Sequence, residues 1–202
     1  MKTLNYIKHI PILLLTMFLF QRCSLDEDPK TFISPDAFFT NYDSYESAVL
    51  GVYHNVPNLF NSDCMMILEM FSDIYDEPNA SYEQALPTYQ NDMRPIYYNT
   101  RRFWQYAYAT IKNANFVISK MPEGSEYIPL QAEAKFLRAY AYFYLVQIYG
   151  DVPLRKVPVE SYKDTQIPRS PQQEAYDFIV EDLTYAETNL YDSAPQGSPA
   201  DK

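Results

Sequence analysis

The sequence predicts an all-α fold: an antiparallel array of helices with tetratricopeptide-like hairpins and one long irregular excursion. Four segments carry apolar residues at intervals of three and four, which is the period of one helix face. Proline and glycine mark the turns between the last three segments, and short turns join antiparallel neighbours. A further stretch has no helical period and is rich in proline and polar residues, which is typical of a long loop.

The first helix is predicted at residues 43–56, where apolar residues fall on one face, and Pro57 should end it. Residues 57–99 are predicted to form the irregular excursion, with one short helix at residues 67–71. The second helix is predicted at residues 100–121, with a continuous apolar stripe. Because long loops within compact domains are usually functional, the excursion is the first place to look for a site.

The third helix, residues 127–149, is the most apolar, and apolar side chains occur nearly all round it. Such a helix should be central and buried on several sides, and Gly150 is placed to end it in a left-handed conformation. The fourth helix should run from about residue 171 to 190. Ser170 is its expected N-cap, with Pro171 at the first helical position.

An extended, proline-marked connector is expected at residues 151–169, between the third and fourth helices. Arg138 lies on the apolar third helix, and a buried arginine needs a charged or hydrogen-bonding partner. We expect a structural role, in which Arg138 binds carbonyl groups of the connector or a carboxylate such as Asp151. Functional anion binding is the alternative.

The first 22 residues have the features of a secretory signal peptide: Lys2 and Lys8, then an apolar run at residues 10–20. Cys23 follows directly, which predicts cleavage before it and lipidation of its thiol and amine. The alternative is ordinary cleavage nearby, with Cys23 as a bystander thiol. Cys64, within an apolar run, is expected to be a small buried residue.

The chain thus divides into four predicted parts. These are a signal peptide at residues 1–22, an acidic anchor or linker at 23–42, a helical domain at 43–191 and a polar tail at 192–202. Removing the signal peptide takes away three positive charges and lowers the net charge from −10 to about −13. Nucleic acid is excluded as a partner, because a polyanion would be repelled.

Aromatic and amide side chains gather in the excursion and at the start of the second helix. Sugar rings stack on aromatic faces, while amides, carboxylates and guanidinium groups bind their hydroxyls. The candidate ligand-binding residues are Asp73, Asp76, Asn79, Tyr82, Tyr97, Tyr98, Asn99, Arg101 and Trp104. Core packing is the alternative for Trp104, which lies on the inner stripe of its helix.

Catalytic chemistry has few candidate residues. His54 is the one histidine beyond the signal peptide, and the four glycines are isolated, so no phosphate loop is present. We therefore expect no enzyme, no metal and no cofactor. Asp73 and Asp76 keep a glycoside hydrolase as a third hypothesis, since that chemistry needs two nearby carboxylates.

One run of residues resembles a known family. The stretch AEAKFLRAYAYF at residues 132–143, continued by LVQIYGDVPL at 145–154, is similar to the hallmark stretch of the RagB/SusD family. Further matching residues occur in the family's order: Leu25 and Asp26 after Cys23, Trp104 to Asn115 on the second helix, and Pro168 to Leu183 around the fourth.

The resemblance implies a surface lipoprotein of the outer membrane that binds oligosaccharides and delivers them to a TonB-dependent transporter. Members of the family are much longer, so this chain resembles their N-terminal helical domain alone. A helical-repeat scaffold that binds a protein partner is the alternative function.

Overall fold

A computed structural model describes residues 33–61, residue 64 and residues 98–191, with backbone only at residues 98 and 99. The chain divides into two units, residues 1–38 and 39–202. The described part of the first unit holds one short helix, α3 (Pro35–Phe38). Ser34 precedes this helix, and its hydroxyl accepts the Ala37 N–H at 3.3 Å. The predicted signal peptide, the Cys23 site, the short helix at 67–71 and the polar tail lie outside these residues.

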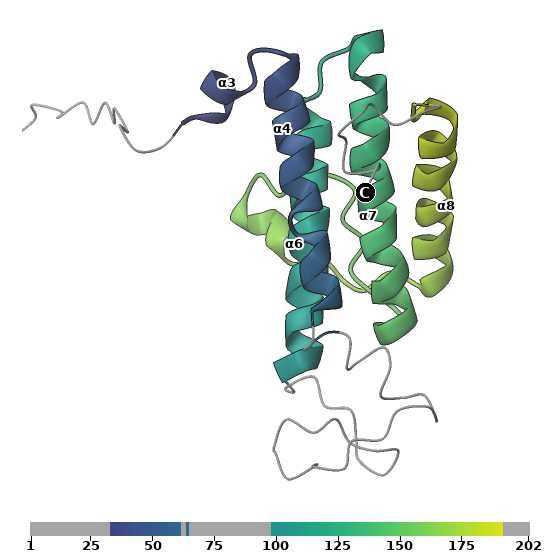
Figure 1. The fold of residues 1–202 in the computed structure, drawn as a ribbon. Helices are drawn as coiled ribbons and strands as arrows, with labels where there is room; N and C mark the ends of the chain where they lie inside the picture. Colours follow the sequence, from purple (N-terminus) through teal and green to yellow (C-terminus); the bar gives the residue numbers. More distant parts are fainter. Residues whose placement is uncertain (1–32, 62–63, 65–97, 192–202) are drawn as a thin grey trace, which may run out of the picture. The chain divides into compact units, whose positions relative to one another are not determined.

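The described residues of the second unit form helices joined by loops and 3-10 turns (Figure 1). The helices are α4 (Tyr42–Tyr53), α6 (Tyr98–Lys120), α7 (Ile128–Tyr149) and α8 (Gln172–Asn189). The 3-10 turns are η1 (Val56–Phe60), η2 (Ser125–Tyr127) and η3 (Tyr162–Thr165). Between residues 98 and 191 the β-structure is limited to one isolated bridge, Val152 with Ser170. The all-α prediction is confirmed.

Two hydrogen bonds between Asn41 and Ser44 cap the start of helix α4. The Asn41 side chain accepts the Ser44 N–H at 3.0 Å, and the Ser44 hydroxyl accepts the Asn41 N–H at 3.3 Å, which is a capping box. The helix ends at Tyr53, three residues earlier than predicted. Pro57 disfavours an α conformation before it, and the chain continues as the 3-10 turn η1.

The helices α6 and α7 match their predicted ranges closely. Figure 1 shows α7 between α6 and α8, with α4 alongside α6 and α7. Leu137, Tyr142 and Leu145 of α7 are fully buried or nearly so, which confirms its central place. At its end Gly150 has the predicted positive φ, 71°, but its ψ of −122° lies outside the left-handed α region. Glycine suits this position because a side chain would be strained at such a φ.

The predicted cap of α8 is wrong. Pro171 occupies the N-cap position and offers no side-chain hydrogen bond. Ser170 instead donates its N–H to the Val152 carbonyl at 2.9 Å, and this bridge brings Asp151 to the helix start. The Asp151 carboxylate accepts the Gln172 N–H at 3.1 Å. A negative charge at this end also complements the helix dipole.

Arg138 is buried, and each of its three side-chain nitrogens donates at least one hydrogen bond. Its Nε and Nη2 donate to the two carboxylate oxygens of Asp182 at 2.7 and 2.8 Å. Its Nη1 donates to Asn115 Oδ1 at 2.6 Å and to the Lys156 carbonyl at 3.1 Å. The predicted structural role at the connector is confirmed, but the carboxylate is Asp182 and not Asp151.

Two buried clusters make up the core. One joins α6, α7 and α8 and includes the buried Cys64, as predicted for that thiol. The other joins α4 with the facing halves of α6 and α7. Within the described ranges, none of the helices is both long enough and apolar enough to cross a membrane.

Candidate functional site

The structure describes only part of the predicted site. The predicted site residues outside the described ranges are Asp73, Asp76, Asn79, Tyr82 and Tyr97. Tyr98 and Asn99 are the first residues of α6, where the backbone alone is described. Arg101 is exposed on the first turn of α6, and Trp104 is half-buried one turn later. The described part of the site is therefore the start of α6 and the side chains around it.

Trp104 lies at the edge of the core. Its ring meets Tyr149 of α7 edge to face, with 5.0 Å between centroids, and lies 4.8 Å from the ring of Tyr108. Such contacts stabilise by about 0.5–1.5 kcal/mol each. They hold the indole in place while leaving part of it accessible, so Trp104 both packs and faces outward.

The hydroxyl groups beside Trp104 are bound to backbone carbonyls. Tyr149 donates to the Thr100 carbonyl at 2.5 Å, and Tyr108 donates to the Pro153 carbonyl at 2.7 Å. Burial raises the pKa of both phenols well above the usual value, so both stay protonated and act as donors. The Tyr149 bond fastens the end of α7 to the start of α6, and the Tyr108 bond fastens α6 to the connector after α7.

Aromatic rings are concentrated where α6 begins and α7 ends. We call this region the aromatic end, comprising Phe60, Phe103, Trp104, Tyr108, Tyr140, Tyr144 and Tyr149. Phe60 of η1 meets Tyr144 edge to face at 5.3 Å. Tyr144 in turn meets Tyr140 at 5.2 Å. Burial, with the Tyr144 hydrogen bond, raises the pKa of Tyr140 to about 12.

Two phenylalanines extend this region on the outward side of α7. Phe136 and Phe143 are 37% and 39% exposed, on the side of α7 that the predicted burial on several sides leaves open. The Phe136 ring stacks with Tyr140 at 6.1 Å, and Phe143 meets Tyr144 at 5.5 Å. Sequence reasoning missed this row. The spacing of 136, 140 and 143 places all three on one helix face, and that was the available signal.

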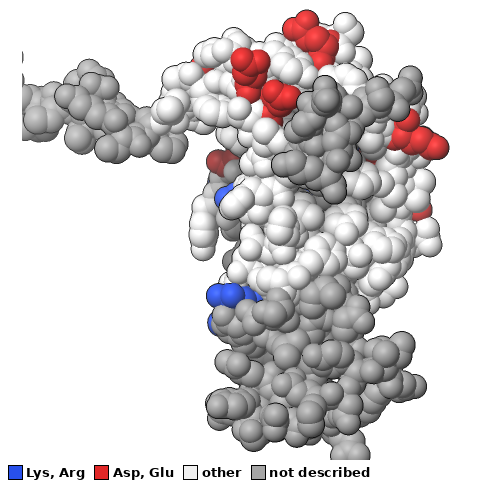
Figure 2. Space-filling view, viewed as in Figure 1, with Lys and Arg blue, Asp and Glu red and all other residues white. Residues whose placement is uncertain are grey.

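Charged side chains are distributed unevenly over the molecule. Figure 2 shows acidic side chains over the upper part of the view and a broad uncharged area between them and the basic side chains at lower left. Exposed aromatic rings can stack on a sugar, and an exposed guanidinium group such as that of Arg101 can donate to sugar hydroxyls. Among the described residues, no group of three metal-ligating side chains occurs.

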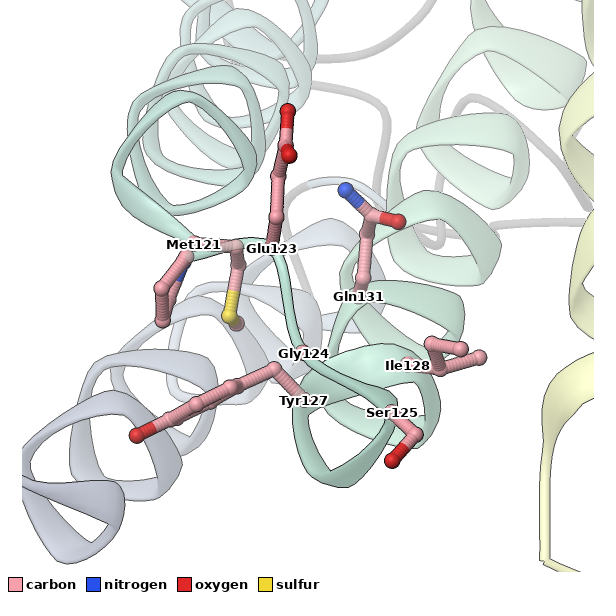
Figure 3. A pocket seen from close by; sticks show the side chains of 8 residues that line it. Met121, Glu123, Gly124, Ser125, Tyr127, Ile128 and Gln131 are labelled. Atoms are coloured by element: carbon pink, nitrogen blue, oxygen red, sulfur yellow. The ribbon is translucent and has the colours of Figure 1, made fainter.

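A separate pocket of about 370 Å³ lies at the turn between α6 and α7 (Figure 3). Its lining residues are Met121, Pro122, Glu123, Gly124, Ser125, Tyr127, Ile128 and Gln131. None of them was a predicted site residue. The pocket adjoins the start of α7, whereas the aromatic end adjoins its finish.

Comparisons with known proteins identify the family. Residues 31–199 match a family of SusD-like proteins, described as starch-binding and associating with the outer membrane. The chain is 28% identical over 190 residues to SusD-like protein P25 of Formosa agariphila, covering 85% of this chain and 35% of that protein.

Solved structures of related proteins have a fold similar to that of this chain. A SusD-like protein of Bacteroides fragilis is 26% identical, with a TM-score of 0.68 over 83% of this chain and 33% of that one. Another similar structure, solved with xylogluco-oligosaccharide, is 26% identical, with a TM-score of 0.59 over 77% of this chain and 31% of that one. The chain spans about a third of the length of these relatives. By the extent of the match and by its fold, the chain belongs to the SusD-like family.

Proposed function

We propose that this chain binds neutral oligosaccharides through the aromatic end and the two exposed phenylalanines that extend it on α7, Phe136 and Phe143. The observation that carries the proposal is the row of partly exposed rings on α7, Phe136, Tyr140 and Phe143, next to the packed rings of Phe60 and Tyr144. Sugar rings stack on such faces. The family's description as starch-binding supports this ligand class.

Polar contacts would come from the start of α6. We propose that Arg101 donates to sugar hydroxyls and that Trp104, Tyr98 and Asn99 lie beside the bound ligand. Arg101 is exposed, and Trp104 is held with part of its ring accessible. The other predicted ligand contacts lie outside the described residues and stay predictions. They are Asp73, Asp76, Asn79, Tyr82 and Tyr97.

Binding without hydrolysis is part of the proposal. The similar structure solved with xylogluco-oligosaccharide supports an oligosaccharide as the ligand. Incubating the chain with that oligosaccharide and separating the products by chromatography would test this. Release of shorter sugars, abolished by Asp73→Asn or Asp76→Asn, would favour the glycoside hydrolase hypothesis instead.

We further propose that the chain is lipidated at Cys23, lies at the cell surface and passes its ligand to a TonB-dependent outer-membrane transporter. The family's association with the outer membrane supports the location. Mass spectrometry of the mature protein would detect the lipid on Cys23. Co-purification from outer membranes, with or without Cys23→Ala, would test the anchoring and the transporter partner.

Calorimetric titration with xylogluco-oligosaccharide and malto-oligosaccharide tests the binding proposal. Arg101→Ala should weaken affinity about tenfold, because it removes a charge-assisted hydrogen bond of about 1.5 kcal/mol or more. Lys112→Ala, at an exposed position of the same helix, is the matched control and should bind normally. Equal affinity in all three proteins would contradict the proposed site.

The scaffold hypothesis has one observation in its favour. Val180 and Leu183 of α8 are 59% and 40% exposed, on a helix that packs mainly against α7. An apolar helix face of this kind can hold another helix. Val180→Glu should disrupt a protein partner while leaving glycan binding unchanged, and this pair of readouts separates the two functions.

A further inference from the structure

We propose that the pocket at the α6–α7 turn is a second binding site, which takes one neutral sugar unit. It lies at the opposite end of α7 from the aromatic end, because it adjoins Ile128 and not Tyr149. The ligand class rests on the proposed function, whereas the site and its residues are independent of it. Its volume of about 370 Å³ is near the lower limit for ligand pockets, which suits a single sugar unit.

A fixed aromatic side chain forms one wall. Tyr127 meets Tyr45 of α4 edge to face at 5.1 Å, and its ring centroid lies 5.9 Å from that of Tyr42. Figure 3 shows the Tyr127 side chain extending from the turn toward α4. Gly124 passes close to this ring, since a Cβ added there would lie 3.3 Å from Tyr127 Cδ2. The turn therefore packs tightly against the Tyr127 ring at residue 124, and an added methyl group would have to displace that ring.

A hydrogen-bonded amide also lines the pocket. Gln131 Oε1 accepts the Tyr185 hydroxyl at 2.5 Å, and the Tyr185 ring is itself held under the Lys135 ammonium at 3.7 Å. The oxygen of the amide is thus occupied, and its two N–H groups are left to donate. In Figure 3 the Gln131 amide and the Glu123 carboxylate extend to the same side of the turn.

The remaining polar groups favour a neutral ligand. Glu123 supplies an exposed carboxylate that accepts hydrogen bonds from hydroxyls, and Ser125 supplies a hydroxyl. Glu126 adds a second negative charge to the turn, and residues 121–131 contain no lysine or arginine. Lys120 directly precedes the turn, and the Lys135 ammonium lies over the Tyr185 ring beside Gln131, so the nearby charges balance and favour a ligand without net charge. A donor, an acceptor and an aromatic wall around one pocket match a ring that carries several hydroxyl groups.

Tyrosines continue beyond the pocket. The hydroxyls of Tyr42 and Tyr191 lie 3.0 Å apart and share a hydrogen bond, which links α4 to the residue that follows α8. Tyr42 also lies beside Tyr127 of the pocket. Neighbouring units of a bound oligosaccharide would meet these side chains, so a short oligosaccharide should bind here more tightly than a monosaccharide.

Calorimetric titration of the whole chain with xylogluco-oligosaccharide and malto-oligosaccharide provides the test. Glu123→Ala and Gln131→Ala each remove one hydrogen-bonding group and should weaken one of two binding events about five- to tenfold. Gly124→Ala keeps every polar group but brings a methyl group against Tyr127, and it should weaken the same event. Gln147→Ala, exposed on the same helix, is the matched control and should bind as the wild type does.

The outcomes separate this inference from the proposed function. In an Arg101→Ala background, residual binding that is lost on adding Gln131→Ala would support a second site. Binding lost in Arg101→Ala but unchanged in all three pocket variants would overturn the second site and leave the proposed function intact. Binding of tetramethylammonium without either oligosaccharide would overturn the neutral-sugar assignment, and no binding of any probe to the wild type would overturn both proposals.

Discussion

The two connections of α7 differ in a way that their lengths do not predict. The turn before it, residues 121–127, is short and exposed, and its polar side chains face a pocket. The connector after it, residues 151–169, is long, yet buried side chains of the helices bind its backbone along its first half. Tyr108 donates to the Pro153 carbonyl, Asn115 to the Arg155 carbonyl, and Arg138 to the Lys156 carbonyl.

The two connections differ in how many polar groups can still form hydrogen bonds with a ligand. A polar group that already holds a backbone carbonyl contributes to stability and has little left to offer a ligand. On the connector side the buried polar groups are occupied. On the turn side Glu123, Ser125 and the Gln131 amide keep hydrogen-bonding capacity. Variants on the connector side should therefore affect folding, and those on the turn side should affect binding.

The largest effect is expected for Asp182→Ala. It leaves the buried Arg138 guanidinium without its carboxylate, and breaking a buried ion pair costs about 3–5 kcal/mol. Urea denaturation followed by circular dichroism would measure the free energy of unfolding. Pairing Asp182→Leu with Arg138→Met removes both charges and should recover much of the loss. A cost below about 1 kcal/mol for Asp182→Ala would contradict the structural role of this pair.

Tyr142→Phe tests one anchor of the connector. The Tyr142 hydroxyl donates to the Arg155 carbonyl at 3.0 Å and accepts the Arg155 N–H at 2.7 Å. Removing it leaves both backbone groups without this partner, which should lower the free energy of unfolding by about 1–3 kcal/mol. Tyr185→Phe, on the turn side, loses one bond to the partly exposed Gln131 and should cost less. An equal loss of unfolding free energy in Tyr142→Phe and Tyr185→Phe would contradict the distinction between the two connections.

Gly150→Ala should destabilise at the point where the connector begins. Its φ of 71° is unfavourable for a side chain by roughly 1–2 kcal/mol. An added Cβ would also lie 2.8 Å from Gln172 Nε2. Gly51→Ala is the matched control, because a Cβ at Gly51 would meet nothing within 4 Å, and an alanine within α4 should stabilise it. Thermal unfolding of the two variants should shift in opposite directions.

The smallest expected effect is a change in stability with pH that comes from Glu133. Burial, partly offset by a hydrogen bond from Tyr53, raises the pKa of Glu133 above its ordinary value of 4.5. The folded state therefore holds this proton more strongly than the unfolded state, and stability falls as pH rises from 4.5 through the raised pKa. Glu133→Gln should match the wild type at low pH and become the more stable protein above this window. Unfolding free energies of Glu133→Gln and the wild type that differ by the same amount at every pH would contradict the raised pKa of Glu133.

Much of the fold could be predicted because it depends on local patterns. The apolar period placed α6 and α7 to within two residues at each end, and Gly150 marked the end of α7. The cap of α8 could not be found locally. It is formed by Asp151, which is 21 residues away from Gln172 and is brought there by the bridge between Val152 and Ser170.

The site was less predictable for the same reason. Arg101 and Trp104 were expected at the start of α6, but their neighbour Tyr149 comes from the far end of α7. The α6–α7 pocket combines a turn with a glutamine whose partner, Tyr185, is 54 residues away. Spacing along the chain cannot reveal such pairs, because antiparallel helices bring together residues that are distant in sequence.

Trp104 offers the most direct test of the binding proposal, since it is the one tryptophan in the chain and lies at the aromatic end. Its fluorescence should be followed while xylogluco-oligosaccharide or malto-oligosaccharide is added. We predict a saturable change in emission for at least one glycan, reduced in affinity by Arg101→Ala and unchanged by Gln131→Ala. Heat of binding with no change in Trp104 emission would contradict a glycan site at the aromatic end.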